Sequence, residues 1–140
     1  MRRLWLFPIV ALASAGAGFS QPAQAPALPA LSLVQPGQWA LKARDAAENR
    51  SICVADPRAL LQVRHNGVSC NRFVIASNAK DATVHYSCPG AGYGRTTLRV
   101  ETPRLVQIES QGIADQEPFA VTFEARRVGE CGARTSALRR

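Results

Sequence analysis

The chain has 140 residues, with 17 lysine and arginine residues against 10 acidic ones and a formal net charge of +7. Five arginines lie near the chain ends (Arg2, Arg3, Arg134, Arg139 and Arg140), so the body between them carries only +2. The basic residues of the body are scattered and do not alternate with aromatic residues, which argues against nucleic-acid binding. A chain of this length forms a single domain once any targeting segment is removed.

The first 20 residues have the pattern of a cleavable signal peptide. Arg2 and Arg3 precede an apolar run over residues 4–13, and small residues follow it. The run is too short to act as a stable transmembrane anchor. We therefore expect cleavage near Ser20 and a mature protein that is periplasmic or secreted, the alternative being a buried N-terminal helix.

Residues 21–36 are rich in proline and alanine. Proline fixes φ and lacks an amide donor, so this composition predicts a flexible, extended lead in front of the domain. The folded β domain is then expected to span residues 37–133. Residues 134–140 form a basic C-terminal tail.

The start of the body predicts two strands and one short helix. Residues 37–44 alternate apolar and polar side chains, as a half-buried strand does, and a second strand is expected over residues 50–54. Asp56 is a suitable N-cap and Pro57 a suitable first helical residue. This pair predicts a brief helix over residues 58–62.

The rest of the body reads as a meander of short strands joined by tight turns. The expected strands cover residues 70–77, 81–88, 95–101, 104–111 and 119–127. The fold class is therefore mainly all-β, a curved antiparallel meander sheet or small barrel with one short helix. Trp39, Phe119 and Phe123 share the apolar side of this sheet, where they form either a core or a ligand-binding face.

Four cysteines are expected to brace this domain. An exported chain meets an oxidising compartment, where an even number of cysteines favours disulfides over metal or thiol chemistry. Three pairings are possible. Cys70 and Cys88 are each nine residues from Ala79, so the predicted hairpin places them opposite each other. Cys53 and Cys131 are then left to form the second disulfide.

These cysteines and their neighbours resemble landmarks of the DUF3617 family of exported bacterial proteins. The resemblance rests on Pro36-Gly37-Gln38-Trp39, on the segment Cys53–Leu60, on Cys70 and Cys88, and on the closing segment Arg126–Cys131. It covers about residues 36–131. The family has no assigned biochemical activity, so the resemblance implies a compartment and an architecture but no reaction. Ala40, where relatives often have an acidic residue, and the lack of methionine-rich segments depart from the family pattern.

The chemically suggestive groups are better explained as ordinary structure. The glycine-rich segment 90–94 follows a strand, but a phosphate-binding loop needs a helix after it, and the next residues read as another strand. His65, Cys70, His85 and Cys88 lack the spacing of a zinc module, and paired cysteines leave no free thiol for a nucleophile. We therefore predict no catalytic, cofactor-binding or metal-binding residue, no cofactor, and a protein that is not an enzyme.

Two functions remain as hypotheses. In the first, the protein is an envelope module that binds a small hydrophobic ligand or a lipid on the concave side of its sheet. In the second, it is an inhibitor or a chaperone-like partner of a periplasmic enzyme and works through exposed loops at residues 90–94 and 112–117. A pocket beside Trp39, Phe119 or Phe123 would favour the first hypothesis, and a filled interior together with a rigid protruding loop would favour the second.

Overall fold

The computed structural model describes residues 27–132, which form a seven-stranded antiparallel sheet and short helical segments. The strands are β1 (Gly37–Ala43), β2 (Arg50–Val54), β3 (Asn71–Ser77), β4 (Asp81–Cys88), β5 (Gly92–Thr102), β6 (Leu105–Ala114) and β7 (Glu117–Gly129). The helical segments are α1 (Pro29–Ser32) and the 3-10 helices η1 (Ala46–Glu48) and η2 (Pro57–His65). The predicted signal peptide, the first part of the lead and the basic tail lie outside the described residues.

The strand order of the sheet is β2-β1-β7-β6-β5-β4-β3. Strands β3 to β7 form a meander, and the first hairpin of the chain, β1–β2, joins it by pairing β1 with the last strand, β7. The two terminal strands of this order, β2 and β3, do not pair with each other, so the sheet stays open. Of the two predicted forms, a curved antiparallel meander sheet or a small barrel, the structure has the open sheet.

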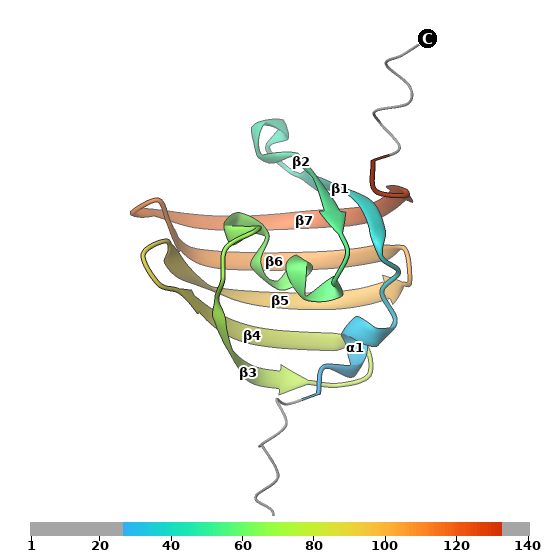
Figure 1. Ribbon diagram of the computed structural model, residues 1–140, viewed down its shortest axis with the longest axis horizontal. Helices are drawn as coiled ribbons and strands as arrows, with labels where there is room; N and C mark the ends of the chain where they lie inside the picture. The colour runs from blue at the N-terminus through green and yellow to red at the C-terminus, as the bar shows by residue number, and fades with distance from the viewer. Residues whose placement is uncertain (1–26, 133–140) are drawn as a thin grey trace, which may run out of the picture.

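The sheet curls around α1 and η2, which lie in its hollow (Figure 1). Apolar side chains from this inner face and from the two helical segments form one core cluster. Its largest members have no exposed surface and include Trp39, Leu41, Leu60, Leu61 and Phe123. Burial of this apolar area is the main favourable term in folding such a domain.

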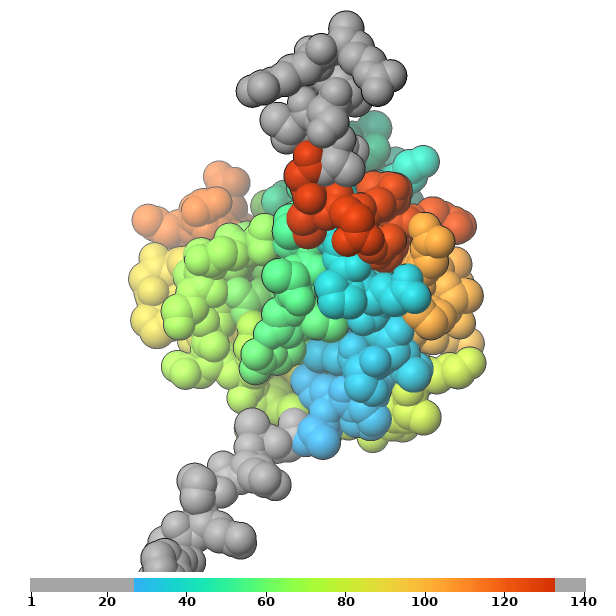
Figure 2. All heavy atoms as spheres, turned by 45° about the vertical axis from the view of Figure 1, so that its right-hand side comes forward, coloured from blue at the N-terminus to red at the C-terminus, as the bar shows by residue number. Residues whose placement is uncertain are grey.

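The lead is shorter than predicted, because the chain is already packed from α1 onward. Ala30, Leu31 and Val34 are buried in the core, and the backbone amide of Gln35 donates to the Pro103 carbonyl at 2.9 Å. In Figure 2 these first described residues (blue) are packed against β1 (cyan). The composition suggested a flexible segment, but Pro29 occupies a favourable first helical position and three apolar side chains follow at helical spacing. The prediction of a flexible lead up to residue 36 is therefore wrong for its second half.

The predicted short helix is present and is longer than expected. As predicted, the Asp56 side chain caps it, accepting from the Arg58 amide at 2.9 Å, with Pro57 at the first helical position. The segment continues to His65 and has a non-helical residue, Gln62, in its middle. That kink lets Leu60 and Val63 on either side of it both reach the core.

Strands β5 and β6 extend through glycines that were expected, from the sequence, to lie in loops. A Cβ at Gly94 would lie 2.5 Å from the Tyr86 hydroxyl oxygen, and a Cβ at Gly112 would lie 2.1 Å from the Tyr93 carbonyl oxygen. Only glycine permits such close approach. The two expected loops are therefore tight turns, at residues 89–91 and at Asp115-Gln116, rather than extended binding loops.

Both predicted disulfides are present. Cys70 and Cys88 are joined across the β3–β4 hairpin with 4.2 Å between their Cα atoms. Cys53 of β2 is joined to Cys131, just after β7, with 5.4 Å between the Cα atoms. The second disulfide therefore ties the edge of the first hairpin to the end of the described chain.

Candidate functional site

Of the predicted face of Trp39, Phe119 and Phe123, the structure buries Trp39 and Phe123 in the core. Trp39 and Phe123 have no exposed surface, so nothing as large as a water molecule touches them. The Trp39 indole nitrogen donates to the Gln35 carbonyl at 3.0 Å, which satisfies its polar atom. Phe119, near the start of β7, is the partly exposed member of the three. The hollow of the sheet is filled beside Trp39 and Phe123.

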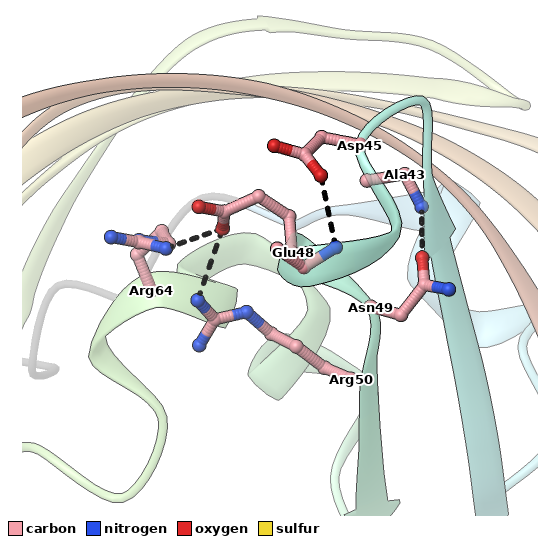
Figure 3. Close-up of polar contacts among 7 residues, drawn as sticks. Ala43, Asp45, Glu48, Asn49, Arg50 and Arg64 are labelled. Atoms are coloured by element: carbon pink, nitrogen blue, oxygen red, sulfur yellow. Dashed lines mark hydrogen bonds and ion pairs between the residues drawn. The ribbon is translucent and has the colours of Figure 1, made fainter.

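Phe119 is covered by a charged cluster at the mouth of the hollow. The Arg64 guanidinium lies 5.3 Å from the centre of the Phe119 ring. Figure 3 shows Glu48 accepting from two arginines, Arg64 at 2.6 Å and Arg50 at 3.3 Å. Asp45 caps the short helix that carries Glu48 by accepting from the Ala47 amide at 3.0 Å. These contacts hold Arg64 in place over Phe119, although such partly exposed ion pairs contribute little to stability individually.

His65 is buried inside a polar network and acts as a structural residue. Its Nε2 lies 2.9 Å from the Ala91 carbonyl oxygen, which can only accept, so Nε2 donates and Nδ1 accepts from the Tyr86 hydroxyl at 3.1 Å. Burial raises the pKa of Tyr86 while a hydrogen bond with Ser110 works in the opposite direction, so the hydroxyl keeps its proton. Ser110 in turn bonds Thr96 at 2.8 Å. Both ring nitrogens of His65 are therefore already used.

Removing the Tyr86 hydroxyl should measurably destabilise the protein. In Tyr86→Phe the buried His65 Nδ1 loses its donor, so we expect the free energy of unfolding to fall by about 1–3 kcal/mol. Urea denaturation with the disulfides intact measures the change. Tyr93→Phe is the matched control, because Tyr93 is 49% exposed and its hydroxyl can bond water instead. Equal unfolding midpoints for both variants would contradict the network.

The histidines and cysteines weighed as a metal site are not brought together. Cys70 and Cys88 are bonded to each other, His65 lies on the inner side of the sheet, and His85 is on the exposed side of β4. Across residues 27–132, no three His, Cys, Asp or Glu side chains are placed to hold a metal ion. Within the same range, no helix has the length and apolar character needed to cross a membrane.

The open edge of β3 carries the most exposed large aromatic side chain of the described residues. Phe73 is 70% exposed and Ile75 is 45% exposed, although both belong to a strand. Among residues 27–132, β3 pairs with β4 only, so within this range its other edge presents unpaired backbone groups. We call Phe73, Ile75 and this free edge the β3 edge patch. Sequence reasoning missed it, because the consecutive apolar residues 73–75 show only that apolar side chains lie on both faces of the strand, not that one of them is exposed.

A shallow polar groove crosses the outer face of the sheet. One depression of about 340 Å³ and a neighbouring one of about 240 Å³ share Arg95 and Gln111. Together they are lined by side chains from β4 to β7, and we call them the outer groove. Its outward-facing side chains are His85, Tyr93, Arg95, Thr97, Glu109, Gln111, Ala120 and Thr122.

Comparison of the chain with protein-family models, with curated proteins and with solved structures found no match. The resemblance to the DUF3617 family therefore stays a prediction.

Proposed function

We propose that this chain is an exported, non-enzymatic module that binds a partner protein through the β3 edge patch. The partner would add an extended, uncharged apolar segment as a further strand beside β3, in the manner of β-strand addition. The observation that carries the proposal is the exposure of Phe73 on a strand with a free edge. Export is supported by the signal-like N-terminal pattern and by the two disulfides.

The β3 edge has two of the features that usually protect an edge strand, a bulge at Ile75 and the charged side chain of Arg72, but neither of them covers Phe73. Natural edges are blunted by charged side chains, by proline, by bulges or by a covering segment. β3 has no proline, and its one charged side chain, that of the exposed Arg72, bonds the buried Gln62. The exposed side chains of Phe73 and Ile75 are apolar, so an uncharged apolar segment is the best fit to this edge.

A different chain fits this edge better than a second copy does. The pairing of β3 with β4 shifts register between Val74 and Ala76, which places a bulge at Ile75. In a symmetric pair of β3 strands the bulge would interrupt the new ladder twice. With a partner strand that has no bulge, the ladder is interrupted only once.

The hollow beside Trp39 and Phe123 is filled, so no cavity there supports the alternative proposal of a hydrophobic ligand.

Site-specific photocrosslinking tests this proposal. A photoreactive amino acid is placed at position 73 and, as a matched control, at position 128, because Val128 is 54% exposed on β7. We expect a defined adduct in the cell envelope from position 73 and none from position 128. The adduct protein is then purified and its affinity for the mature chain is measured. Phe73→Lys should weaken binding by about tenfold or more, because burying phenylalanine contributes about 1.5–3 kcal/mol, whereas Val128→Lys should leave it unchanged.

Three outcomes would overturn the proposal. One is equal crosslinking from positions 73 and 128. Another is an adduct with the mass of two copies of this chain, which would indicate self-pairing. The third is a purified partner whose affinity is unaffected by Phe73→Lys.

A further inference from the structure

The outer groove has a regular construction that follows from the register of the sheet. His85, Arg95, Gln111 and Ala120 are successive cross-strand partners on β4, β5, β6 and β7. Thr97, Glu109 and Thr122 form a second row beside them. Neighbouring strands are about 4.8 Å apart, so the first row extends over roughly 14 Å. This length suits a short linear oligomer lying across the strands.

The polar side chains of the groove are available to a ligand. Arg95, Glu109 and Gln111 make no side-chain hydrogen bond or ion pair with any other described residue. They include one positive and one negative group, so the lining has no excess charge. Guanidinium, carboxylate and amide groups are planar and can each make two parallel hydrogen bonds. A neutral ligand with many neighbouring donors and acceptors matches this set.

One end of the groove offers an aromatic surface. Tyr93 is half exposed, and its ring is tilted by 36° to that of His85 with 6.0 Å between the ring centres. Beside it the backbone of Gly94 and Gly112 lines the groove. An exposed aromatic ring with a polar tip binds molecules that combine an apolar face with polar groups. The C–H face of a sugar ring, surrounded by hydroxyl groups, has this character.

We infer that the outer groove binds a neutral oligosaccharide. Tyr93 packs against one sugar ring, and Arg95, Glu109 and Gln111 bond the hydroxyl groups of the units that follow. An apolar ligand does not suit the polar lining, and Glu109 opposes a polyanion. A peptide strand is disfavoured too, because β5 and β6 are paired on both sides and their backbone groups are already used. This site adjoins the β3 edge patch, because His85 is the cross-strand partner of Phe73. It uses other side chains, so the inference does not depend on the proposed function.

Amide chemical shifts of the mature protein test the inference at residue level. The probes are an oligomer of N-acetylglucosamine and one of glucose, each four units long and added to the ¹⁵N-labelled protein. We expect at least one of them to shift the amides of residues 93–97, 109–112 and 120–122. Tyr93→Ala and Gln111→Ala should each weaken its binding by about tenfold, equivalent to about 1.4 kcal/mol. Tyr93→Phe, which keeps the ring, should bind within a factor of about three of the original protein.

Gln107→Ala is the matched control, because Gln107 lies on the same strand and the same face as Gln111 but outside the groove. It should leave the affinity unchanged, and unaltered spectra in the remaining strands verify that each variant is folded. The inference is wrong if neither oligomer shifts groove amides at millimolar concentration, or if Gln107→Ala weakens binding as much as Gln111→Ala. It is also wrong if an uncharged peptide of serine, threonine and glycine shifts the same amides with equal affinity.

Discussion

Replacing Cys53 and Cys131 together by alanine should lower the free energy of unfolding by about 4 kcal/mol. The chain-entropy model gives this value because the disulfide closes a loop with a sequence separation of 78 residues. For a domain of this size the change corresponds to a fall in Tm of about 15 °C or more. Thermal unfolding followed by circular dichroism, with and without reductant, measures it.

The same substitution at Cys70 and Cys88 serves as the comparison. That disulfide closes a loop with a sequence separation of only 18 residues, for which the model gives about 3 kcal/mol. Cys88 is also buried, so its replacement by alanine leaves a small cavity and adds to the loss. The reduced original protein should melt below either variant. A melting curve that is identical with and without dithiothreitol would show that the disulfides do not brace the domain.

Phe123→Ala should lower the free energy of unfolding by about 3–5 kcal/mol, the usual cost of truncating a fully buried aromatic side chain. Phe123 has no exposed surface and belongs to the same core cluster as Trp39. A phenylalanine lining an empty ligand pocket would instead be partly solvated, and its truncation would cost far less. Urea denaturation therefore distinguishes a core residue from a pocket residue.

Phe73→Ala is the matched control for this measurement. Phe73 is the same residue type on a strand of the same sheet, but 70% of its surface is exposed. We expect its truncation to change the free energy of unfolding by no more than about 0.5 kcal/mol. If Phe123→Ala and Phe73→Ala have equal midpoints, the hollow of the sheet is not packed as described.

Local patterns were sufficient to predict most strands and the covalent framework. β2 matches its predicted range, and β1 differs by one residue at its end. The hairpin of β3 and β4 was predicted from a turn at Asn78–Lys80, and the same hairpin placed Cys70 opposite Cys88. These features depend on alternation and on short-range turn geometry, which the sequence contains directly.

The errors occurred where a residue's role depends on a distant part of the chain. The glycines at positions 94 and 112 suggested loops, but both lie in strands. These positions require glycine because the Tyr86 side chain and the Tyr93 backbone occupy the space that a Cβ would need. The proline-rich lead suggested a flexible segment, but Ala30, Leu31 and Val34 are buried in the core. Neither reason is visible in a local window of sequence.

The two candidate binding sites could not be located from the sequence for the same reason. The apolar run at residues 73–75 is compatible with a central strand buried on both faces, and only the strand order makes β3 an edge with Phe73 exposed. The outer groove combines side chains from four strands, so it depends on the registers of three pairings at once.

The sequence by itself determined the fold class, the alternation of buried and exposed positions, the cap at Asp56 and the pairing of the four cysteines. These follow from interactions between residues that are close in the chain, or from the elimination that a hairpin allows. Only the tertiary structure decided that Trp39 and Phe123 are core and that the sheet stays open at β3. Those properties depend on which segments meet across the hollow, and long-range packing alone sets that arrangement.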